Sequence, residues 1–291
     1  MLALISRTLD SGTRLAAVIG NPVVQSLSPI IHNAVFDSLK VDWLYLAFLV
    51  ETGKVKDALD AMTVFGIAGY SVTMPHKNEV AKLVREIGEI DEIVKTTNSA
   101  NTVMLRQDGS IFATNTDGQG ACNAIEANSS QKIAKSRVVV LGAGGTASAV
   151  VYSLIKNGAT EVVIANRTPA NAETIAQNYE NCRVSSNLDR EVANAQIIIN
   201  TTPVGFNPSG EQKSESVVAP IDVTLINATH TVLDAVYRPL ETGLLLAAKK
   251  VGAQTVDGLE MLVHQASLQQ EVWLGERGDT KLMRRAALNH Q

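Results

Sequence analysis

Two residues of the chain stand where they could handle a proton. Lys77 falls in the first turn of a helix that we expect to begin near His76. A cation there opposes the helix dipole, so a sequence built for stability alone would avoid it. Asp117 lies between a predicted strand and a helix expected from Ala121, where it could equally cap that helix. Lys77 is therefore the stronger candidate for proton exchange, and His76, the alternative base, has the simpler reading of a turn residue.

A pair of serines indicates a site for a small anion. Pro29 suits the first helical position, which makes Ser28 the expected N-cap. Ser26 adds a second hydroxyl beside the same helix N-terminus, and together they make a compact pocket for a carboxylate. Two amides are further candidates: Asn101 is either a turn residue or a donor to a ligand hydroxyl, and Gln265 lies at the edge of an apolar helix face.

A glycine-rich turn carries the strongest single signal. It fits the pattern G-x-G-x-x-G/A, with Ala147 in the third place, and lies between a β-branched strand and a helix. Gly142 permits the tight turn, Gly144 lets a pyrophosphate approach the backbone, and Ala147 lets helix and strand pack closely. The run therefore predicts a dinucleotide site made of Gly142, Ala143, Gly144, Gly145, Thr146 and Ala147.

The next predicted strand ends in a sequence that selects the dinucleotide. An NAD site usually places Asp or Glu here to bind the ribose 2′-hydroxyl. This chain has Asn166 followed by Arg167. Because a guanidinium can bind a 2′-phosphate that a carboxylate would repel, we expect NADP as the cofactor rather than NAD.

The elements that must position these residues alternate between strand and helix. In the first region we expect strands over residues 15–19, 43–50, 67–74, 100–105 and 111–114, and helices over 29–39, 54–62 and 76–87. The turn Gln107-Asp108-Gly109 makes a hairpin of the last two strands, so this sheet is mixed. In the second region we expect strands over residues 137–141, 161–165, 196–200 and 232–236, and helices over 147–157, 170–179, 239–252 and 258–274. This order predicts a doubly wound parallel sheet, with residues 203–220 as the longest loop.

Length and composition limit the class of protein. The 291 residues correspond to two domains at about 150 residues each. The chain is 45% hydrophobic with a formal net charge of −4, which argues against a nucleic-acid-binding protein. No apolar run reaches the ~18 residues of a membrane span, and the N-terminus lacks the pattern of a signal peptide. Cys122 and Cys182 lack metal-ligand spacing, so we predict no metal site. Two cysteines cannot make a disulfide framework, and with no signal peptide or membrane span we predict a cytoplasmic protein without membrane partners.

Taken together and in order, these motifs resemble the shikimate dehydrogenase family, including its quinate/shikimate branch. The matching segments run over nearly the full chain: Gly20-Asn21-Pro22, Ser26-Leu27-Ser28-Pro29, His32-Asn33, Val72-Thr73-Met74-Pro75-His76-Lys77, Asn101-Thr102, Asn115-Thr116-Asp117-Gly118, Gly142 to Ala147, Asn166-Arg167-Thr168, Asn200-Thr201-Thr202, Asp234 to Pro239, and Asp257-Gly258-Leu259 with Met261-Leu262-Val263 and Gln265.

The resemblance implies an N-terminal three-layer α/β substrate domain with a mixed sheet and a C-terminal Rossmann domain, with the active site between them. The substrate domain is expected over residues 1–116, joined by the C-terminal helices of residues 258–291, and the NADP-binding domain over 117–257. The implied activity is reversible, NADP-dependent reduction of 3-dehydroshikimate to shikimate, on the route to chorismate and aromatic amino acids, by a monomer or homodimer.

The resemblance also implies a role for each site residue. Lys77 and Asp117 would form the catalytic pair, and Ser26 and Ser28 would hold the substrate carboxylate. The ring and its hydroxyls would meet Thr73, Asn101, Tyr237 and Gln265. Cofactor contacts would come from the glycine turn and from Asn166, Arg167, Thr168, Thr201, Val236 and Gly258.

The chain departs from the family pattern at three places. Asn98-Ser99-Ala100 replaces Gly-Ala-Val before Asn101, Ser71 stands where Asn is common, and Asn171 stands where NADP users often carry a second arginine. Two alternatives therefore stay open: an NAD-dependent quinate/shikimate or aminoshikimate dehydrogenase, and a sensor that binds shikimate or quinate without turnover. The sensor would be expected to have lost Lys77, Asp117 or the glycine turn.

Overall fold

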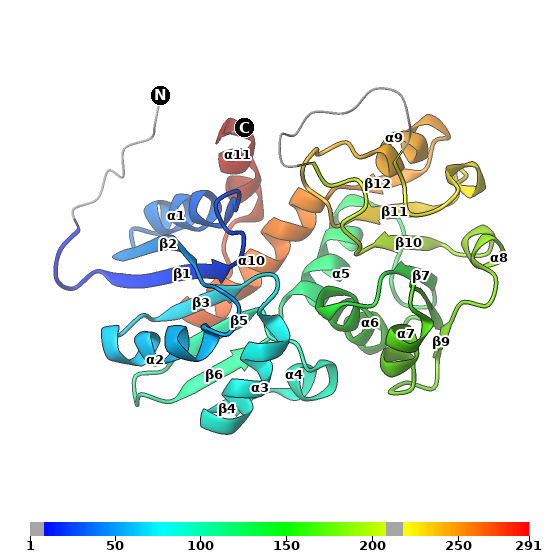
Figure 1. Cartoon of the computed structure of the whole chain (residues 1–291). Helices are drawn as coiled ribbons and strands as arrows, with labels where there is room; N and C mark the ends of the chain where they lie inside the picture. Colours follow the sequence, from blue (N-terminus) through cyan, green and yellow to red (C-terminus); the bar gives the residue numbers. More distant parts are fainter. Residues whose placement is uncertain (1–8, 208–217, 291) are drawn as a thin grey trace. The chain divides into compact units, whose positions relative to one another are not determined.

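The chain folds into two compact units. The computed structural model describes residues 9–207 and 218–290, so residues 208–217 of the predicted loop lie outside the described residues. Unit 1 comprises residues 1–116 and 266–291, and unit 2 comprises residues 117–265 (Figure 1). The boundary at 265/266 falls within one continuous helix, α10 (Gly258–Leu274).

Unit 1 is built on a six-stranded mixed sheet, here called sheet A, with the strand order β2-β1-β3-β5-β6-β4. Strand β1 pairs in parallel with β2 and β3, whereas β5 is antiparallel to β3 and β6. The mixed sheet and its hairpin are confirmed. Besides part of α10, the elements are β1 (Arg14–Gly20), α1 (Ser28–Leu39), β2 (Trp43–Leu49), α2 (Val55–Phe65), β3 (Gly69–Val72), α3 (Lys77–Ile87), β4 (Glu89–Ile90), α4 (Glu92–Thr97), β5 (Thr102–Leu105), β6 (Ile111–Thr114) and α11 (Thr280–His290).

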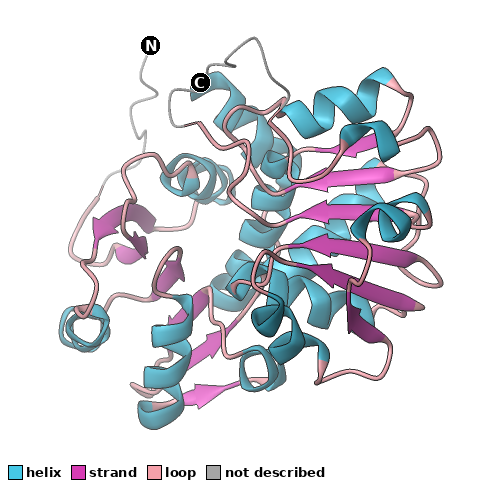
Figure 2. Cartoon of the chain, turned by 45° about the vertical axis from the view of Figure 1, so that its right-hand side comes forward, coloured by secondary structure: helices cyan, strands magenta, loops and turns pink. Residues whose placement is uncertain are grey.

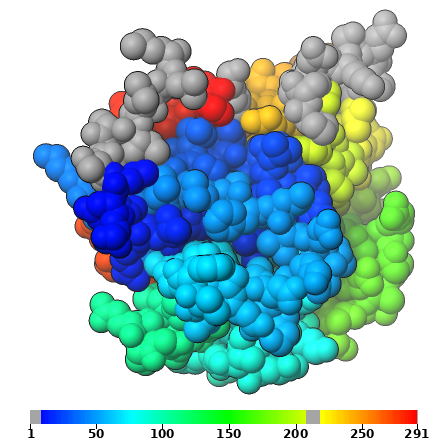
Figure 3. Space-filling view, turned by 60° about the vertical axis from the view of Figure 1, so that its left-hand side comes forward, coloured from blue at the N-terminus to red at the C-terminus, as the bar shows by residue number. Residues whose placement is uncertain are grey.

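Helices cover both faces of sheet A, so its strands have buried side chains on either side. On one face Val18 packs in a cluster with Phe36 of α1 and Trp273 of α10. On the other face the Tyr70 hydroxyl donates to the Ala58 carbonyl of α2, 3.1 Å away. Unit 1 therefore has three layers; Figure 3 turns its N-terminal part, coloured blue to cyan, towards the viewer.

Unit 2 is built on a parallel sheet, here called sheet B, with the order β12-β11-β10-β7-β8-β9. This doubly wound order confirms the predicted Rossmann-type fold. Besides the first half of α10, the elements are α5 (Asp117–Asn128), β7 (Arg137–Leu141), α6 (Gly145–Lys156), β8 (Glu161–Ala165), α7 (Pro169–Ala176), β9 (Cys182–Val184), α8 (Leu188–Ala193), β10 (Ile197–Asn200), a 3-10 turn (Val223–Leu225), β11 (Thr231–Asp234), α9 (Gly243–Lys250) and β12 (Gln254–Val256).

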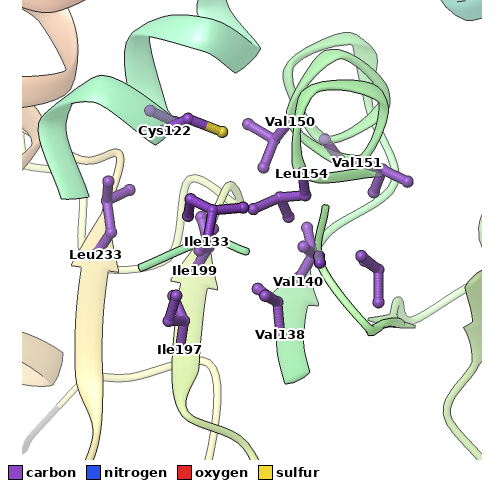
Figure 4. Close-up of a cluster of buried hydrophobic side chains, with 14 of the residues drawn as sticks. Cys122, Ile133, Val138, Val140, Val150, Val151, Leu154, Ile197, Ile199 and Leu233 are labelled. Atoms are coloured by element: carbon purple, nitrogen blue, oxygen red, sulfur yellow. The ribbon is translucent and has the colours of Figure 1, made fainter. Parts of the chain in front are cut away.

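Both faces of sheet B are apolar and covered by helices, as the β-branched runs predict. On one face Val138 and Val140 of β7 pack with Val150 and Leu154 of α6 and with residues of α5, including Cys122 (Figure 4). On the other face, Val139 belongs to a cluster that includes residues of α8 and α9. Figure 2 shows the strands of this sheet side by side with helices on either side.

Six short elements were not predicted: β4, α4, β9, α8, the 3-10 turn and β12. Each has two to six residues, too few to establish a period in the sequence. The two helices are instead marked by side-chain caps. Asp91 Oδ1 accepts from the Val94 amide at 3.2 Å, and Asn187 Oδ1 accepts from the Arg190 amide at 3.1 Å.

Helix α5 begins at Asp117, so the expected start at Ala121 is wrong. Gly118 and Gly120 lie within this helix, and the close approach of a neighbouring helix leaves no room for a side chain at Gly118. A Cβ atom at Gly118 would lie 1.9 Å from the Ala149 carbonyl oxygen of α6. The glycines thus serve helix packing rather than a turn.

Candidate functional site

The predicted substrate residues of unit 1 lie at one edge of sheet A. Strands β1 and β3 end there, and the antiparallel strand β5 begins there, since Ser71 of β3 pairs with Thr102 of β5. The segments that follow β1 and β3 and precede β5 carry five predicted residues: Ser26, Ser28, Thr73, Lys77 and Asn101. Unit 1 by itself brings all five to the same edge.

Close contact between chain segments fixes this edge. The Thr73 amide donates to the Ile19 carbonyl at 3.0 Å, and the Asn21 amide donates to the Met74 carbonyl at 2.9 Å. A Cβ atom at Gly20 would lie 2.2 Å from Thr73 Cγ2, so any larger residue there would displace the Thr73 side chain. Thr73 is thereby held at the end of β3.

The two serines stand at the start of α1, but not as predicted. The helix begins at Ser28, its N-cap is Leu27, and Pro29 is the second helical residue, so the assignment of Ser28 as the N-cap is wrong. The Leu27 side chain cannot accept a hydrogen bond. Ser26 Oγ, 3.2 Å from the Ser28 amide, accepts that bond instead. Both hydroxyl-bearing residues still belong to the helix N-terminus.

Tyr45 forms a hydrogen bond with Ser28, the second serine of this pair. Burial raises the pKa of the Tyr45 hydroxyl, and hydrogen bonds with the Ser71 and Ser28 hydroxyls partly oppose that rise. Its O–H donates to Ser71 Oγ at 2.6 Å. Tyr45 is therefore a neutral phenol that is hydrogen-bonded to Ser71 and Ser28.

Lys77 is the first residue of α3, so it lies in the first turn of the helix, as predicted, although the helix begins one residue after His76. Its carbonyl accepts from the Ala100 amide at 3.0 Å. His76 Nε2 lies 2.7 Å from the Val50 carbonyl, and the side chain is buried. His76 thus joins two chain segments, which supports its reading as a structural residue.

Asn101 is tied to the segment that leads to Asp117. Its Oδ1 accepts from the Thr116 amide at 2.8 Å, and its Nδ2 donates to Thr116 Oγ1 at 3.0 Å. Because Ala100 binds the Lys77 carbonyl, hydrogen bonds within unit 1 connect Lys77, through Ala100 and Asn101, to the residue just before Asp117.

The substituted turn before Asn101 is accommodated without glycine. Asn98 ends α4 with a φ of 49°, in the left-handed region, which Asn tolerates better than other side chains. Asn115 Nδ2 donates to the Ser99 carbonyl at 3.0 Å. The departure at 98–100 therefore keeps the turn.

In unit 2 the glycine turn lies at the carboxyl end of β7, where the order of strands in sheet B reverses. Gly142 has a φ of 111°, a value that side-chain-bearing residues rarely adopt. Thr201, after β10, covers the turn, since both its amide and its hydroxyl donate to the Leu141 carbonyl at 2.9 and 2.7 Å. Such a switch point between β7 and β10 is where doubly wound sheets bind ligands.

The turn leaves room for a phosphate. Gly144 is the N-cap of α6 in extended conformation, and a Cβ atom there would meet nothing within 4 Å. Ala147 is 1% exposed and belongs to the apolar core, as the third position of the motif requires. An open space at Gly144 beside the N-terminus of α6 fits the diphosphate of a dinucleotide.

Residues 166–168 follow β8, the strand next to β7. The Gly142 amide donates to the Ala165 carbonyl at 2.8 Å, so Asn166 begins directly beside the glycine turn. Asn166 Nδ2 donates to the Thr168 carbonyl at 2.9 Å, and Arg167 and Thr168 are exposed. This places a solvent-facing guanidinium where a 2′-phosphate would be recognised.

Models of the family's domains match the chain in three segments. A shikimate dehydrogenase substrate-binding domain matches residues 18–103, a shikimate/quinate 5-dehydrogenase domain matches 124–209, and a shikimate 5′-dehydrogenase C-terminal domain matches 258–288. A shikimate dehydrogenase (NADP(+)) of Methanopyrus kandleri is 36% identical over 98% of this chain and 99% of its own length. The chain belongs to the shikimate dehydrogenase family.

Solved structures agree with this membership. A shikimate 5-dehydrogenase from Thermus thermophilus, in complex with NADP(H) and shikimate, has a TM-score of 0.85 at 29% identity and covers 96% of this chain and 100% of that one. A quinate dehydrogenase from Corynebacterium glutamicum, in complex with NAD, has a TM-score of 0.84 at 27% identity, covering 95% and 99%. Enzymes with different substrates and nucleotides thus share this fold, so the choice of substrate and nucleotide depends on side chains.

The segment after β11, which contains Val236, is held by a buried carboxylate, Asp234, to which the sequence analysis assigned no role. Asp234, at the end of β11, accepts from Asn200 Nδ2, the Val236 amide and Thr242 Oγ1 at 2.8, 3.1 and 2.7 Å. Burial raises the pKa of Asp234, and these hydrogen bonds oppose the rise. The sequence did carry a signal for this pair, because the apolar strands β10 and β11 each end in a polar residue, Asn200 and Asp234.

Gly258 and Gln265 sit on α10. A Cβ atom at Gly258 would lie 2.5 Å from the Val236 carbonyl oxygen, so glycine is required. Gln265 Nε2 donates to the Leu262 carbonyl at 2.8 Å. Tyr237 follows Val236 in the loop after β11, and burial raises the pKa of its hydroxyl.

Asp117 begins α5, and Thr146 Oγ1 lies 3.5 Å from its Oδ2 within unit 2. Its pairing with Lys77 stays a prediction, because the two residues belong to different units.

Three further features of the chain are its cysteines, possible metal sites and possible membrane-spanning helices. Cys122 and Cys182 are buried, and burial raises the pKa of both thiols to about 12. Over residues 9–207 and 218–290, no group of three or more His, Cys, Asp or Glu side chains could hold a metal ion. Within those same ranges no helix has the length and apolar character needed to cross a membrane.

Proposed function

We propose that this chain is an NADP-dependent shikimate dehydrogenase, reversibly reducing 3-dehydroshikimate to shikimate in the biosynthesis of chorismate and aromatic amino acids. The observation that carries the proposal is the edge of sheet A. One unit there gathers two serines, a threonine, a lysine and an amide, and continues through Thr116 into Asp117. This set suits a small polyhydroxylated carboxylate, and relatives named for this activity match over almost the whole chain.

Each of the two predicted domains has a main task in this proposal. Residues 1–116 with the C-terminal helices of 258–291 bind the substrate, and residues 117–257 bind NADP. Ser26 and Ser28 hold the substrate carboxylate at the N-terminus of α1, where the helix dipole favours an anion. Contacts to the ring and its hydroxyls come from Thr73, Asn101, Tyr237 and Gln265.

The chemistry requires a proton donor beside the reacting oxygen. NADP, held by the Gly142–Ala147 turn with Asn166, Arg167, Thr168, Thr201, Val236 and Gly258, supplies or accepts the hydride. Reduction of a carbonyl leaves negative charge on its oxygen. Lys77, paired with Asp117, donates a proton there and stabilises that charge, a contribution of about 10²- to 10⁴-fold in rate.

NADP is favoured over NAD by the residues after β8. Neither Asn166 nor Arg167 would repel a 2′-phosphate, and Arg167 is exposed and able to bind it. Asn171 does not supply the second arginine common among NADP users, so the proposed preference depends mainly on Arg167. A cytoplasmic monomer or homodimer completes the proposal, and the unpaired thiols of Cys122 and Cys182 suit a reducing compartment.

Initial rates measured with shikimate and with quinate, each against NADP and NAD, test the proposal. The expected outcome is that shikimate with NADP gives the highest kcat/KM. Faster turnover of quinate with NAD would favour the quinate dehydrogenase alternative. Binding of shikimate by calorimetry without turnover in any combination would favour the sensor.

A further inference from the structure

A chain of buried hydrogen bonds runs beneath the proposed substrate residues of unit 1. Tyr45 O–H donates to Ser71 Oγ at 2.6 Å, and Ser71 Oγ donates to Gln269 Oε1 at 2.8 Å. Gln269 Nε2 donates to the Asn101 carbonyl and to Thr102 Oγ1, both at 3.1 Å. All five residues are buried, and Gln269, on α10, is the link between β3 and the start of β5.

Groups that can act in only one way fix the direction of this chain. The Asn101 carbonyl can only accept, so the side chain of Gln269 must turn its NH₂ group towards it. Its oxygen then faces Ser71, which must donate to it. The Ser71 oxygen therefore accepts from Tyr45.

The same reasoning fixes the side chain of Asn101. Thr102 Oγ1 accepts from Gln269, so its proton goes to Asn101 Oδ1, 2.7 Å away. The Thr116 amide, which can only donate, also binds Asn101 Oδ1, at 2.8 Å. Both bonds require the oxygen of the amide on this side, so its NH₂ group is on the other.

We propose, building on the proposed function, that Gln269 is a positioning residue: it orients the amide of Asn101 so that Asn101 offers N–H rather than C=O to the substrate. Asn101 then donates to a ring hydroxyl and holds Thr116, the residue before Asp117. Ser71 and Gln269 act together here, since the serine at the position where the family often has Asn needs an acceptor from α10.

The neighbouring residue Gln270 provides a matched control. It is buried to the same degree on the same helix, but its Nε2 contacts His32 Nδ1 at 3.1 Å rather than Asn101 or Thr102. Gln269→Leu and Gln270→Leu each remove one buried amide of similar size. Both should lower the melting temperature, but only Gln269→Leu should disturb Asn101.

The first measurement is hydrogen exchange at the Thr116 amide in the full chain, which needs no substrate. Gln269→Leu should accelerate this exchange roughly tenfold relative to Gln270→Leu, because the oriented acceptor for that amide is lost. Equal exchange rates in the two variants would overturn the inference, whatever the activity of the protein.

The second measurement is a double-mutant cycle on shikimate oxidation. Gln269→Leu should raise the KM for shikimate roughly tenfold and leave the KM for NADP unchanged. If Gln269 acts through Asn101, the variant carrying both Gln269→Leu and Asn101→Ala should lose no more kcat/KM than Asn101→Ala alone, within about twofold. Multiplying losses would show a merely structural role. Absence of turnover in the parent protein would contradict the proposed function, while the exchange measurement would still decide the role of Gln269.

Discussion

At the scale of single residues, the proposed chemistry depends most on the Lys77 ammonium. Replacing Lys77 by Ala removes the proton donor but leaves the glycine turn of unit 2 intact. We expect kcat for shikimate oxidation to fall by about 10²- to 10⁴-fold, with the dissociation constant for NADP unchanged. Initial-rate assays measure kcat, and fluorescence titration with reduced NADP measures the dissociation constant.

Lys82 is the matched control for this variant, because it is an exposed lysine on the same helix α3. Lys82→Ala should keep the parental kcat. If kcat of Lys77→Ala stayed within a few-fold of the parent, Lys77 would not be the proton donor.

Arg167 carries the nucleotide preference in the same direct way. Arg167→Ala removes the guanidinium proposed to bind the 2′-phosphate, a charge-assisted pair worth about 1.5–3 kcal/mol, or roughly ten- to a hundredfold. The KM for NADP should rise accordingly while the KM for NAD stays constant. Arg190→Ala, at another exposed arginine of unit 2, should change neither constant. An equal rise for both nucleotides would contradict recognition of the 2′-phosphate.

At the scale of elements, two glycines of one turn should respond differently to the same substitution. A methyl group at Gly142 would lie 2.6 Å from Thr201 Oγ1 on a backbone with a φ of 111°, so Gly142→Ala should cost about 1–3 kcal/mol of stability. A methyl group at Gly144 meets no protein atom within 4 Å and occupies the space proposed for the diphosphate. Gly144→Ala should therefore keep the melting temperature and raise the KM for NADP. Thermal unfolding without ligand and nucleotide titrations distinguish these outcomes, and a parental KM in Gly144→Ala would argue against a phosphate at this turn.

The sequence predicts long elements well and short or packed ones poorly. Strand β7 was predictable because Val138 to Leu141 is a continuous apolar run before a glycine turn. The start of α5 was not, since glycines read as a loop unless the neighbouring helix α6 is known. The N-cap of α1 was misassigned by one residue, because whether Pro29 takes the first or second helical position depends on the path of the preceding loop.

The candidate site divides along the same line. The motif residues could be predicted because each stands beside a strand end or a helix start. Asp234 and Gln269 could not be placed, since their roles come from partners 34 and 198 residues away in the sequence, Asn200 and Ser71. A long-range hydrogen bond leaves no local pattern.

At the scale of the whole molecule, the two units allow stability to be followed separately. Both tryptophans of the chain, Trp43 and Trp273, lie in one cluster of unit 1, so their fluorescence reports unfolding of that unit. His32 is in contact with this cluster: its ring stacks on Tyr45 at 4.3 Å and lies 5.4 Å from the Trp273 ring.

His32 should make unit 1 sensitive to acid. Burial lowers the pKa of His32 to about 3, against a smaller opposing effect of a hydrogen bond with Gln269. Below a pH of about 6.5 the unfolded chain takes up a proton on this residue that the folded chain does not, so stability falls with pH by up to about 1.4 kcal/mol per unit. Burial raises the pKa of Asp91 in the same unit, so the folded chain takes up a proton on Asp91 before the unfolded chain does. This raises stability as the pH falls, but only near the ordinary pKa of an aspartate.

The pH window from 6.5 to 5 therefore isolates the histidine. Urea unfolding followed by tryptophan fluorescence should give a free energy of unfolding for unit 1 that falls by about 2 kcal/mol across this window. In His32→Gln the absolute stability will be lower, because a stacked buried ring is lost, but the slope should flatten by about one proton. His290→Gln, at an exposed residue near the C-terminus, should keep the parental slope. An unchanged slope in His32→Gln would mean that the imidazole is protonated in the folded protein, which its burial against Tyr45 and Trp273 argues against.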